Sequence, residues 1–241
     1  IYAQMAEDYQ DLSADAQIAS PYAALLDVNN HRIIAGKLAD TKIYPASMTK
    51  VMTLIVVSEN IDKMPKTYTF GFEMLNRLYR EEASVAGFLE GETVDVEDLM
   101  YGLVLPSGAD AAEALAIMVA GSNEEFAKLM NEKANEIGCL GTYFITPNGL
   151  DAENDISFHH STAGDLCVIM SYCAWKSPKS TQFLEITQTM QYTFETKEGQ
   201  MVFSNHNRLL KETDYCISGK TGFTTKAGYC YVAAIEKDGR R

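Results

Sequence analysis

Strand-like segments stand at both ends of this chain and enclose a long middle section with helical periodicity. Residues 22–37 have the pattern of a hairpin, in which two apolar runs flank an Asn29-Asn30 turn. Apolar and polar residues alternate again in residues 189–204 and 216–235, and each segment is interrupted by a predicted turn. This order predicts an α+β fold in which N-terminal and C-terminal strands share one antiparallel sheet, packed with a helical subdomain.

The middle section, about residues 47–186, is predicted to be mainly helical. Apolar residues recur there at helical spacing, and Pro106, Gly121 and a Ser122–Glu125 capping box mark helix ends. The first predicted helix begins at Ser47, and the others cover residues 96–105, 109–119, 122–138 and 162–174. The chain's 241 residues have room for one sizeable domain or two small ones. Because the two ends are predicted to share a sheet, we expect one domain over residues 1–241, with strands at about 22–37 and 189–237.

Composition disfavours several classes of partner. A formal net charge of −13 disfavours nucleic acid, since phosphate contacts need clustered Lys and Arg. No apolar run reaches the ~18 residues that cross a bilayer. The five cysteines are odd in number and scattered, which predicts free thiols, and none has a zinc-site spacing with histidine. No carboxylate stands at a metal-site spacing from His159 and His160. We therefore interpret them as loop histidines near the substrate pocket and expect no metal.

Ser47-Met48-Thr49-Lys50 is the first motif with chemical content. Residues three apart lie on the same face of a helix, so the Lys50 amine is expected close to the Ser47 hydroxyl. A serine becomes a strong nucleophile only when a base takes its proton, and a lysine can be that base only if its pKa is lowered. Taken alone, the pair could equally be a helix cap followed by an exposed lysine.

Two further motifs follow at about 60 and then roughly 110 residues' separation. Ser107-Gly108-Ala109 lies in a loop between two predicted helices, where Ser107 could relay a proton or simply cap the second helix. Lys220-Thr221-Gly222 lies on a predicted strand. Lys220 would supply a positive charge that lowers the pKa of Lys50 and attracts a carboxylate, unless it is only a solvated edge lysine.

Together these motifs resemble the serine D-alanyl-D-alanine carboxypeptidases, the low-molecular-weight penicillin-binding proteins, whose superfamily signature is S-x-x-K, S-D-N and K-T-G. The resemblance runs from about Tyr22 to the last residue. Segments around and between the motifs also resemble the family, and they are residues 45–53, 105–108, 148–150, 161–163, 220–224 and 227–229.

The resemblance implies a serine β-lactamase/D,D-peptidase-like fold and a set of residue roles. Ser47 would be acylated by the penultimate D-alanine carbonyl, Lys50 would be the base, and Ser107 would pass a proton to the departing D-alanine. Lys220 and Thr221 would bind the terminal carboxylate. Gly222 would let the substrate backbone approach, and backbone N–H groups of Ser47 and Phe223 would form the oxyanion hole. No cofactor is implied, and β-lactams would acylate the same serine.

Two departures from the family pattern are expected to affect rate and substrate affinity. The middle motif usually ends in an asparagine whose amide touches the motif lysine, and Ala109 stands there instead. Family members also continue with one more strand and a C-terminal helix, which we expect to be missing here because the sequence stops at Arg240-Arg241. Ser58-Glu59-Asn60 has the Ser-x-Asn pattern but falls several helical turns beyond Ser47, so we interpret it as a chance match.

The leading functional hypothesis is hydrolysis of the terminal D-Ala-D-Ala bond of peptidoglycan stem peptides, with transfer to an amine as a variant. A class A-like β-lactamase is a second hypothesis, disfavoured because the expected Glu-x-x-Leu-Asn is absent between Thr146 and His160. A catalytically weak penicillin-binding or sensor module is a third, favoured by Ala109. A cell-wall substrate implies an extracytoplasmic location in a bacterium, secreted or membrane-associated, with any membrane association supplied by segments outside this chain.

Overall fold

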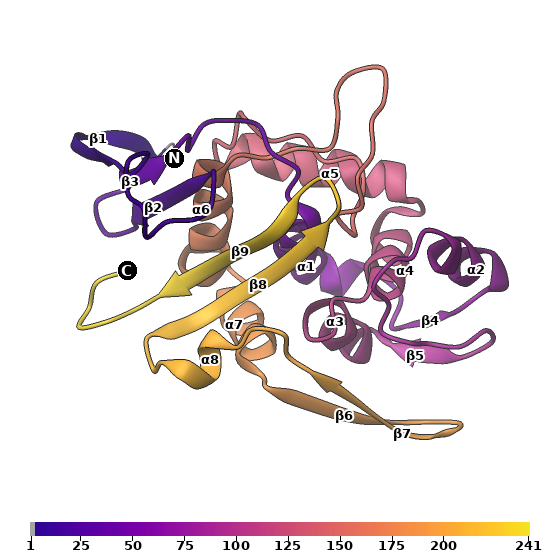
Figure 1. Ribbon diagram of the computed structural model, residues 1–241. Coiled ribbons are helices and arrows are strands. Elements are labelled where there is room, and N and C mark those ends of the chain that lie inside the picture. The colour runs from indigo at the N-terminus through magenta and orange to yellow at the C-terminus, as the bar shows by residue number, and fades with distance from the viewer. Residues whose placement is uncertain (1–2) are drawn as a thin grey trace.

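The computed structural model describes residues 3–241, in which strands near both ends enclose a mainly helical middle section. The strands are β1 (Gln4–Asp11), β2 (Ala23–Asp27), β3 (Arg32–Lys37), β4 (Thr67–Thr69), β5 (Thr93–Asp95), β6 (Gln191–Thr196), β7 (Gly199–Ser204), β8 (Cys216–Thr224) and β9 (Gly228–Ile235). The helices are α1 (Thr49–Asn60), α2 (Phe72–Arg80), α3 (Val96–Val104), α4 (Ala109–Ala120), α5 (Asn123–Glu136), α6 (Ala163–Ser171), α7 (Ser180–Gln188) and α8 (Leu209–Glu212). Figure 1 shows α1 behind the long β8–β9 hairpin, with α2, α3 and α4 to the right of it.

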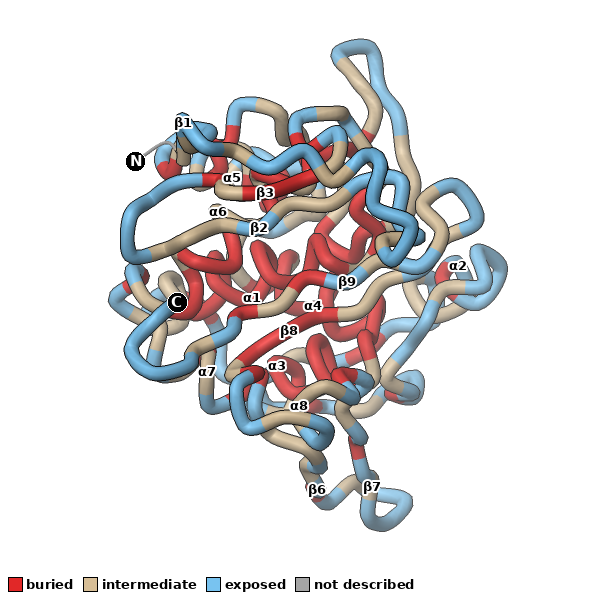
Figure 2. The backbone as a smooth tube through the Cα atoms, turned by 60° about the vertical axis from the view of Figure 1, so that its left-hand side comes forward, coloured by how far each residue is buried: buried red, intermediate tan, exposed pale blue. Residues whose placement is uncertain are grey.

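Helix α1 lies at the centre of the helical part of the fold. Ten of its residues, from Thr49 to Ser58, are buried, because the helix is apolar around nearly its whole circumference. Helices α3, α4, α5 and α7 pack around it, and Figure 2 shows this buried centre beside the strands. Because α1 is held on all sides, the residues at its first turn are fixed in space. No helix within residues 3–241 combines the length and hydropathy that spanning a membrane requires.

The strands form two main groups. β2 pairs antiparallel with β3, and β8 pairs antiparallel with β9 from Cys216↔Ile235 to Thr224↔Gly228. α6 packs against both β2 and β9, and a groove lined by those two strands separates the groups. The expected α+β fold class is confirmed. The two groups lie next to each other but are not hydrogen-bonded into one sheet in the described part of the chain, which differs from the single shared sheet that we expected.

Several elements were not predicted from the sequence. β1 is almost wholly exposed and pairs parallel with β3, unlike the antiparallel arrangement we expected. The helix α2 is amphipathic but polar on average, and it buries only Leu78. The strands β4 and β5 have three residues each, which is too short for an alternation to be recognised. The predicted helices at 96–105, 109–119, 122–138 and 162–174 are present as α3 to α6, the last continued by a π-helical turn, Tyr172–Lys176.

Candidate active site

Ser47 lies in a short 3₁₀ turn, Ala46–Met48, immediately before α1. The α1 N-cap is Met48, which makes no side-chain capping bond, so the helix-cap interpretation of Ser47 is wrong. The serine side chain is instead partly exposed, and its Oγ lies 2.7 Å from Nζ of Lys50. The turn preceding the helix therefore presents a hydroxyl to solvent while the amine approaches it from the protein side.

Lys50 is almost completely buried, with 2% of its surface exposed. Its Nζ donates to the backbone carbonyl of Asn148 at 2.6 Å, in addition to contacting Ser47. Burial holds the pKa of the Lys50 amine well below its ordinary value, and the positive charge of Lys220 lowers it further, whereas Asp110 acts in the opposite direction. These surroundings favour a neutral amine, which is the protonation state that a general base needs.

Lys220 on β8 is also buried, with 3% exposure, so it is not a solvated edge lysine. Its Nζ donates to Oγ of Ser107 at 3.0 Å and to the carbonyl of Thr221 at 2.9 Å. Burial lowers the pKa of Lys220 to about 7. The second and third sequence motifs are therefore joined directly by a hydrogen bond, 113 residues apart in sequence.

Ser107 has a positive φ of 63°, a conformation that costs a non-glycine residue backbone strain. The N-cap of α4 is Gly108, so Ser107 does not cap the helix. Asp110, which sequence reasoning did not single out, fixes the neighbouring loop by accepting from the backbone N–H groups of Ala86 and Gly87 at 2.8 and 3.0 Å. The group that fixes this loop is thus a buried carboxylate that binds backbone, a role that no short motif reveals.

The end of β8 passes across the 3₁₀ turn that carries Ser47. A Cβ added to Gly222 would lie 2.9 Å from the backbone nitrogen of Ser47, so no side chain fits between the strand and the turn. Thr221 is partly exposed, and Phe223 is 57% exposed with its ring 4.8 Å from that of Tyr229. The four strand residues predicted from the sequence therefore lie beside the serine, with Lys220 inside and Phe223 at the surface.

Gly149 closes the opposite side of the turn. Its φ is +86°, and an added Cβ would lie 2.0 Å from the carbonyl oxygen of Ala46. We expect Gly149→Ala to displace Ala46 and Ser47, because backbone atoms cannot move aside as a flexible side chain can. The expected result is a loss of about 1–3 kcal/mol in the free energy of unfolding and a loss of about 100-fold in Ser47 acylation. Denaturant unfolding and acylation kinetics measure the two effects, and Gly199→Ala, at a positive φ in open space, is the control for strain alone.

His159 is a second residue whose position the sequence did not reveal. It is fully buried, its Nε2 lies 2.9 Å from Oγ1 of Thr49, and its Nδ1 accepts from the backbone N–H of Ile145 at 2.9 Å. It therefore fastens the segment that contains Asn148 to α1. Both ring nitrogens have hydrogen-bond partners, which is why the imidazole can be buried, and no spacing in the sequence indicated these partners.

Acid is expected to destabilise the folded protein through His159. Burial lowers the pKa of His159 to about 3 from an ordinary 6.5, so the unfolded chain binds the extra proton between these values. The free energy of unfolding should consequently fall as pH drops from 6.5 towards 3, by up to about 1.4 kcal/mol per pH unit from this group. Urea unfolding across that range measures the slope, and His159→Gln should flatten it. An unchanged slope in His159→Gln would contradict the prediction.

Ala109 is buried at the first position of α4 and offers no side-chain hydrogen bond to the site. Its backbone N–H donates to the carbonyl of Ser84 at 2.7 Å. The amine of Lys50 is held instead by the Asn148 carbonyl, a backbone group that residue patterns do not disclose.

Comparison with known proteins points to one family. The sequence profile of the family described as D-alanyl-D-alanine carboxypeptidase, peptidase S11, matches residues 8–241. The chain is 33% identical to D-alanyl-D-alanine carboxypeptidase DacF of Bacillus subtilis over 91% of its length and 54% of that protein. It is 32% identical to DacB2 of Mycobacterium tuberculosis over 89% of its length and 70% of that protein. Among solved structures, the Streptomyces K15 DD-transpeptidase matches with a TM-score of 0.82 at 30% identity, covering 92% of this chain and 87% of that one. The chain thus spans about half the length of the Bacillus relative.

Proposed function

The chain belongs to the D-alanyl-D-alanine carboxypeptidase family, and from this premise we propose that it hydrolyses the terminal D-Ala-D-Ala bond of peptidoglycan stem peptides through a serine acyl-enzyme. Residues 1–241 would act as one peptidase domain, and β-lactams would acylate the same serine. The observation that carries the proposal is the 2.7 Å contact between the hydroxyl of Ser47 and the buried amine of Lys50. A buried, uncharged amine at hydrogen-bond distance can take the proton that makes the hydroxyl a nucleophile.

In the first step, Ser47 Oγ attacks the carbonyl carbon of the penultimate D-alanine while its proton passes to Lys50. The oxyanion that forms is stabilised by the backbone N–H groups of Ser47 and Phe223, on either side of the close approach at Gly222. Collapse of the tetrahedral intermediate breaks the peptide C–N bond. The proton that Lys50 accepted passes through Ser107 to the departing amine, so that Lys50 is neutral again and Ser107 is unchanged. The contact of Ser107 with Lys220 supports its place in this path.

Lys220 and Thr221 would bind the terminal carboxylate of the substrate. With a pKa of about 7, Lys220 becomes cationic as pH falls through neutrality, and a cation in a buried site attracts a carboxylate more strongly than one in water. Water then attacks the ester carbonyl, with Lys50 as the base, and releases the shortened stem peptide. Because stem peptides belong to the cell wall, we propose that the protein acts outside the cytoplasmic membrane, with secretion or membrane attachment supplied by segments outside residues 1–241.

Two measurements on the wild-type protein test the proposal. Intact-mass spectrometry after incubation with benzylpenicillin should show one added penicilloyl group on Ser47. Incubation with a Lys-D-Ala-D-Ala peptide should release D-alanine. Acylation without any D-alanine release would favour a binding or sensor module, and rapid β-lactam turnover would favour a β-lactamase.

The pH dependence of substrate binding provides a further prediction. Because the pKa of Lys220 is lowered to about 7, the amine loses its charge as pH rises through that value. The KM for a D-Ala-D-Ala peptide should therefore rise by about tenfold per pH unit above neutrality. The rise ends at the pH where Lys220 also loses its proton in the complex, in which the substrate carboxylate raises its pKa. Steady-state kinetics between neutral and alkaline pH measure this. A peptide with a C-terminal amide is the matched control, since its KM should not follow the charge of Lys220.

A further inference from the structure

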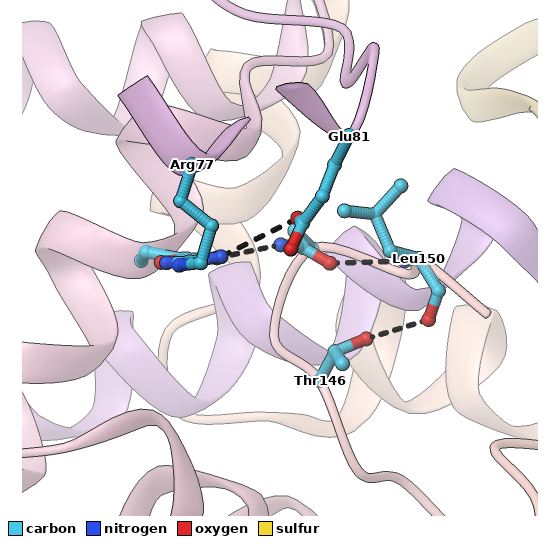
Figure 3. Close-up of polar contacts among 6 residues, drawn as sticks. Arg77, Glu81, Thr146 and Leu150 are labelled. Carbon is cyan, nitrogen blue, oxygen red and sulfur yellow. Dashed lines mark hydrogen bonds and ion pairs between the residues drawn. The ribbon is translucent and has the colours of Figure 1, made fainter. Parts of the chain in front are cut away.

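A buried carboxylate lies one helical turn beyond Ala109, outside the three motifs. Glu113 of α4 is 2% exposed, and its Oε1 accepts from Nδ2 of Asn148 at 2.9 Å. Arg77 of α2 donates to both carboxylate oxygens, at 3.2 Å to Oε1 and by a second bond to Oε2. Figure 3 shows Arg77 reaching into this network from its own helix, with Glu81 beside it. A row of polar groups thus extends from the surface of α2 to Asn148.

Asn148 is held at both ends of its side chain. Its Nδ2 donates to Glu113, and its Oδ1 accepts from the backbone N–H of Leu150 at 2.9 Å. Thr146 adds a 3.1 Å bond to the carbonyl of Leu150, and Figure 3 shows these contacts closing the loop upon itself. Because the side chain cannot rotate without breaking a buried bond, the carbonyl of the same residue is fixed in direction.

We propose that Arg77, Glu113 and Asn148 form a positioning relay that aims the Asn148 carbonyl at the amine of Lys50, and so turns the amine's lone pair towards Ser47. The inference rests on the proposed function, in which Lys50 is the base. A neutral amine has two N–H bonds and one lone pair. When the Asn148 carbonyl accepts one N–H at 2.6 Å, the lone pair can face Ser47 Oγ at 2.7 Å.

The position of Ala109 explains why the site needs such a relay. Residues four apart share a helix face, so Glu113 lies on the same side of α4 as Ala109. Ala109 supplies no amide to the lysine, whereas Glu113 supplies a carboxylate that fixes another amide, that of Asn148. An ion pair with one partly exposed partner adds little stability by itself, so stability alone does not account for the Arg77–Glu113 pair.

An exchange of hydrogen-bond donor and acceptor tests the relay. In Asn148→Asp two carboxylates face each other. In Glu113→Gln one of the two acceptor oxygens becomes an NH2 donor, which opposes the donors of Arg77 or Asn148, and the charge that pairs with Arg77 is lost. In the double variant the new Gln can donate to the new Asp and still accept from Arg77, so the relay is restored in reverse. Each single variant should acylate with benzylpenicillin about 10- to 100-fold more slowly, and the double variant should recover to within about threefold of wild type.

Arg77→Gln tests the same idea from the surface, where 46% of the side chain is exposed. Thermal unfolding checks that the variant is folded, because the buried Glu113 loses its charge partner. Loss of the cation leaves the Glu113 charge unpaired near the Lys50 site, so the pH of half-maximal acylation should move upwards. Lys220 and Asp110 are the other charged groups that act on Lys50, and the variant leaves both in place. Glu125→Gln, which removes an exposed ion pair with Lys128, is the matched control and should leave the profile unchanged.

The outcomes separate the relay from the proposed function. Wild-type protein that is not acylated would overturn both. Wild-type protein that is acylated, together with single variants within about twofold of it, would overturn the relay alone. Slow single variants with an equally slow but folded double variant, judged by thermal unfolding, would also overturn it. Recovery in the double variant, with the shifted pH profile of Arg77→Gln, supports it.

Discussion

Replacement of Ser47 by alanine is expected to abolish covalent labelling by benzylpenicillin and to reduce D-alanine release by at least about 10⁴-fold. The expected size follows from the mechanism, because the acyl-enzyme cannot form without the hydroxyl, and the remaining groups can only bind and polarise the substrate. Intact-mass spectrometry measures the labelling, and a D-alanine assay measures the turnover. A penicilloyl adduct on the variant would show that another residue is the nucleophile.

Ser58→Ala is the matched control for this experiment. Ser58 lies on the same helix, is fully buried, and its Oγ has no hydrogen-bond partner among the described residues. Removing that hydroxyl should leave acylation unchanged and should raise the free energy of unfolding by about 1 kcal/mol, since an unsatisfied buried polar group is costly. Loss of labelling in Ser58→Ala would mean that damage to α1, and not loss of the nucleophile, explains Ser47→Ala.

The positions of Ser47 and Lys50 could be anticipated because both lie within one helical turn. Three-residue spacing fixes their relation whatever the rest of the chain does. The hydrogen bond between Ser107 and Lys220 could not be derived in that way, since it joins segments 113 residues apart. Only the family resemblance placed those two motifs together. In the structure they are joined by a buried hydrogen bond of 3.0 Å from Nζ of Lys220 to Oγ of Ser107.

The groups that the sequence did not disclose act through the backbone or through unremarkable side chains. Asn148 holds Lys50 by its carbonyl, which every residue possesses, so no residue type marks the position. Asp110 and Glu113 are carboxylates on an Ala-rich helix, and an acidic chain contains many others. What distinguishes them is burial, which depends on how α2 and the loop before α4 pack, and that packing is a property of the tertiary structure.

Lys50→Met is expected to slow acylation by about 10²–10⁴-fold, the usual contribution of a general base, while leaving the protein folded.

The pH dependence of the variant's stability provides the sharper test. Because the pKa of buried Lys50 lies well below its ordinary 10.5, the unfolded chain binds more protons than the folded protein as pH falls from that value. Wild-type stability should therefore decrease on acidification from about pH 10 by up to about 1.4 kcal/mol per pH unit from this residue, and Lys50→Met should lack that decrease. Lys220 is buried in both proteins, so the effect of its own burial is common to the two stability curves. Denaturant unfolding from pH 10 to pH 7 measures the difference between the two curves, which should grow steadily in favour of the variant. A difference that stays constant across this range would mean that the folded protein keeps Lys50 charged, and a charged amine cannot take the proton of Ser47.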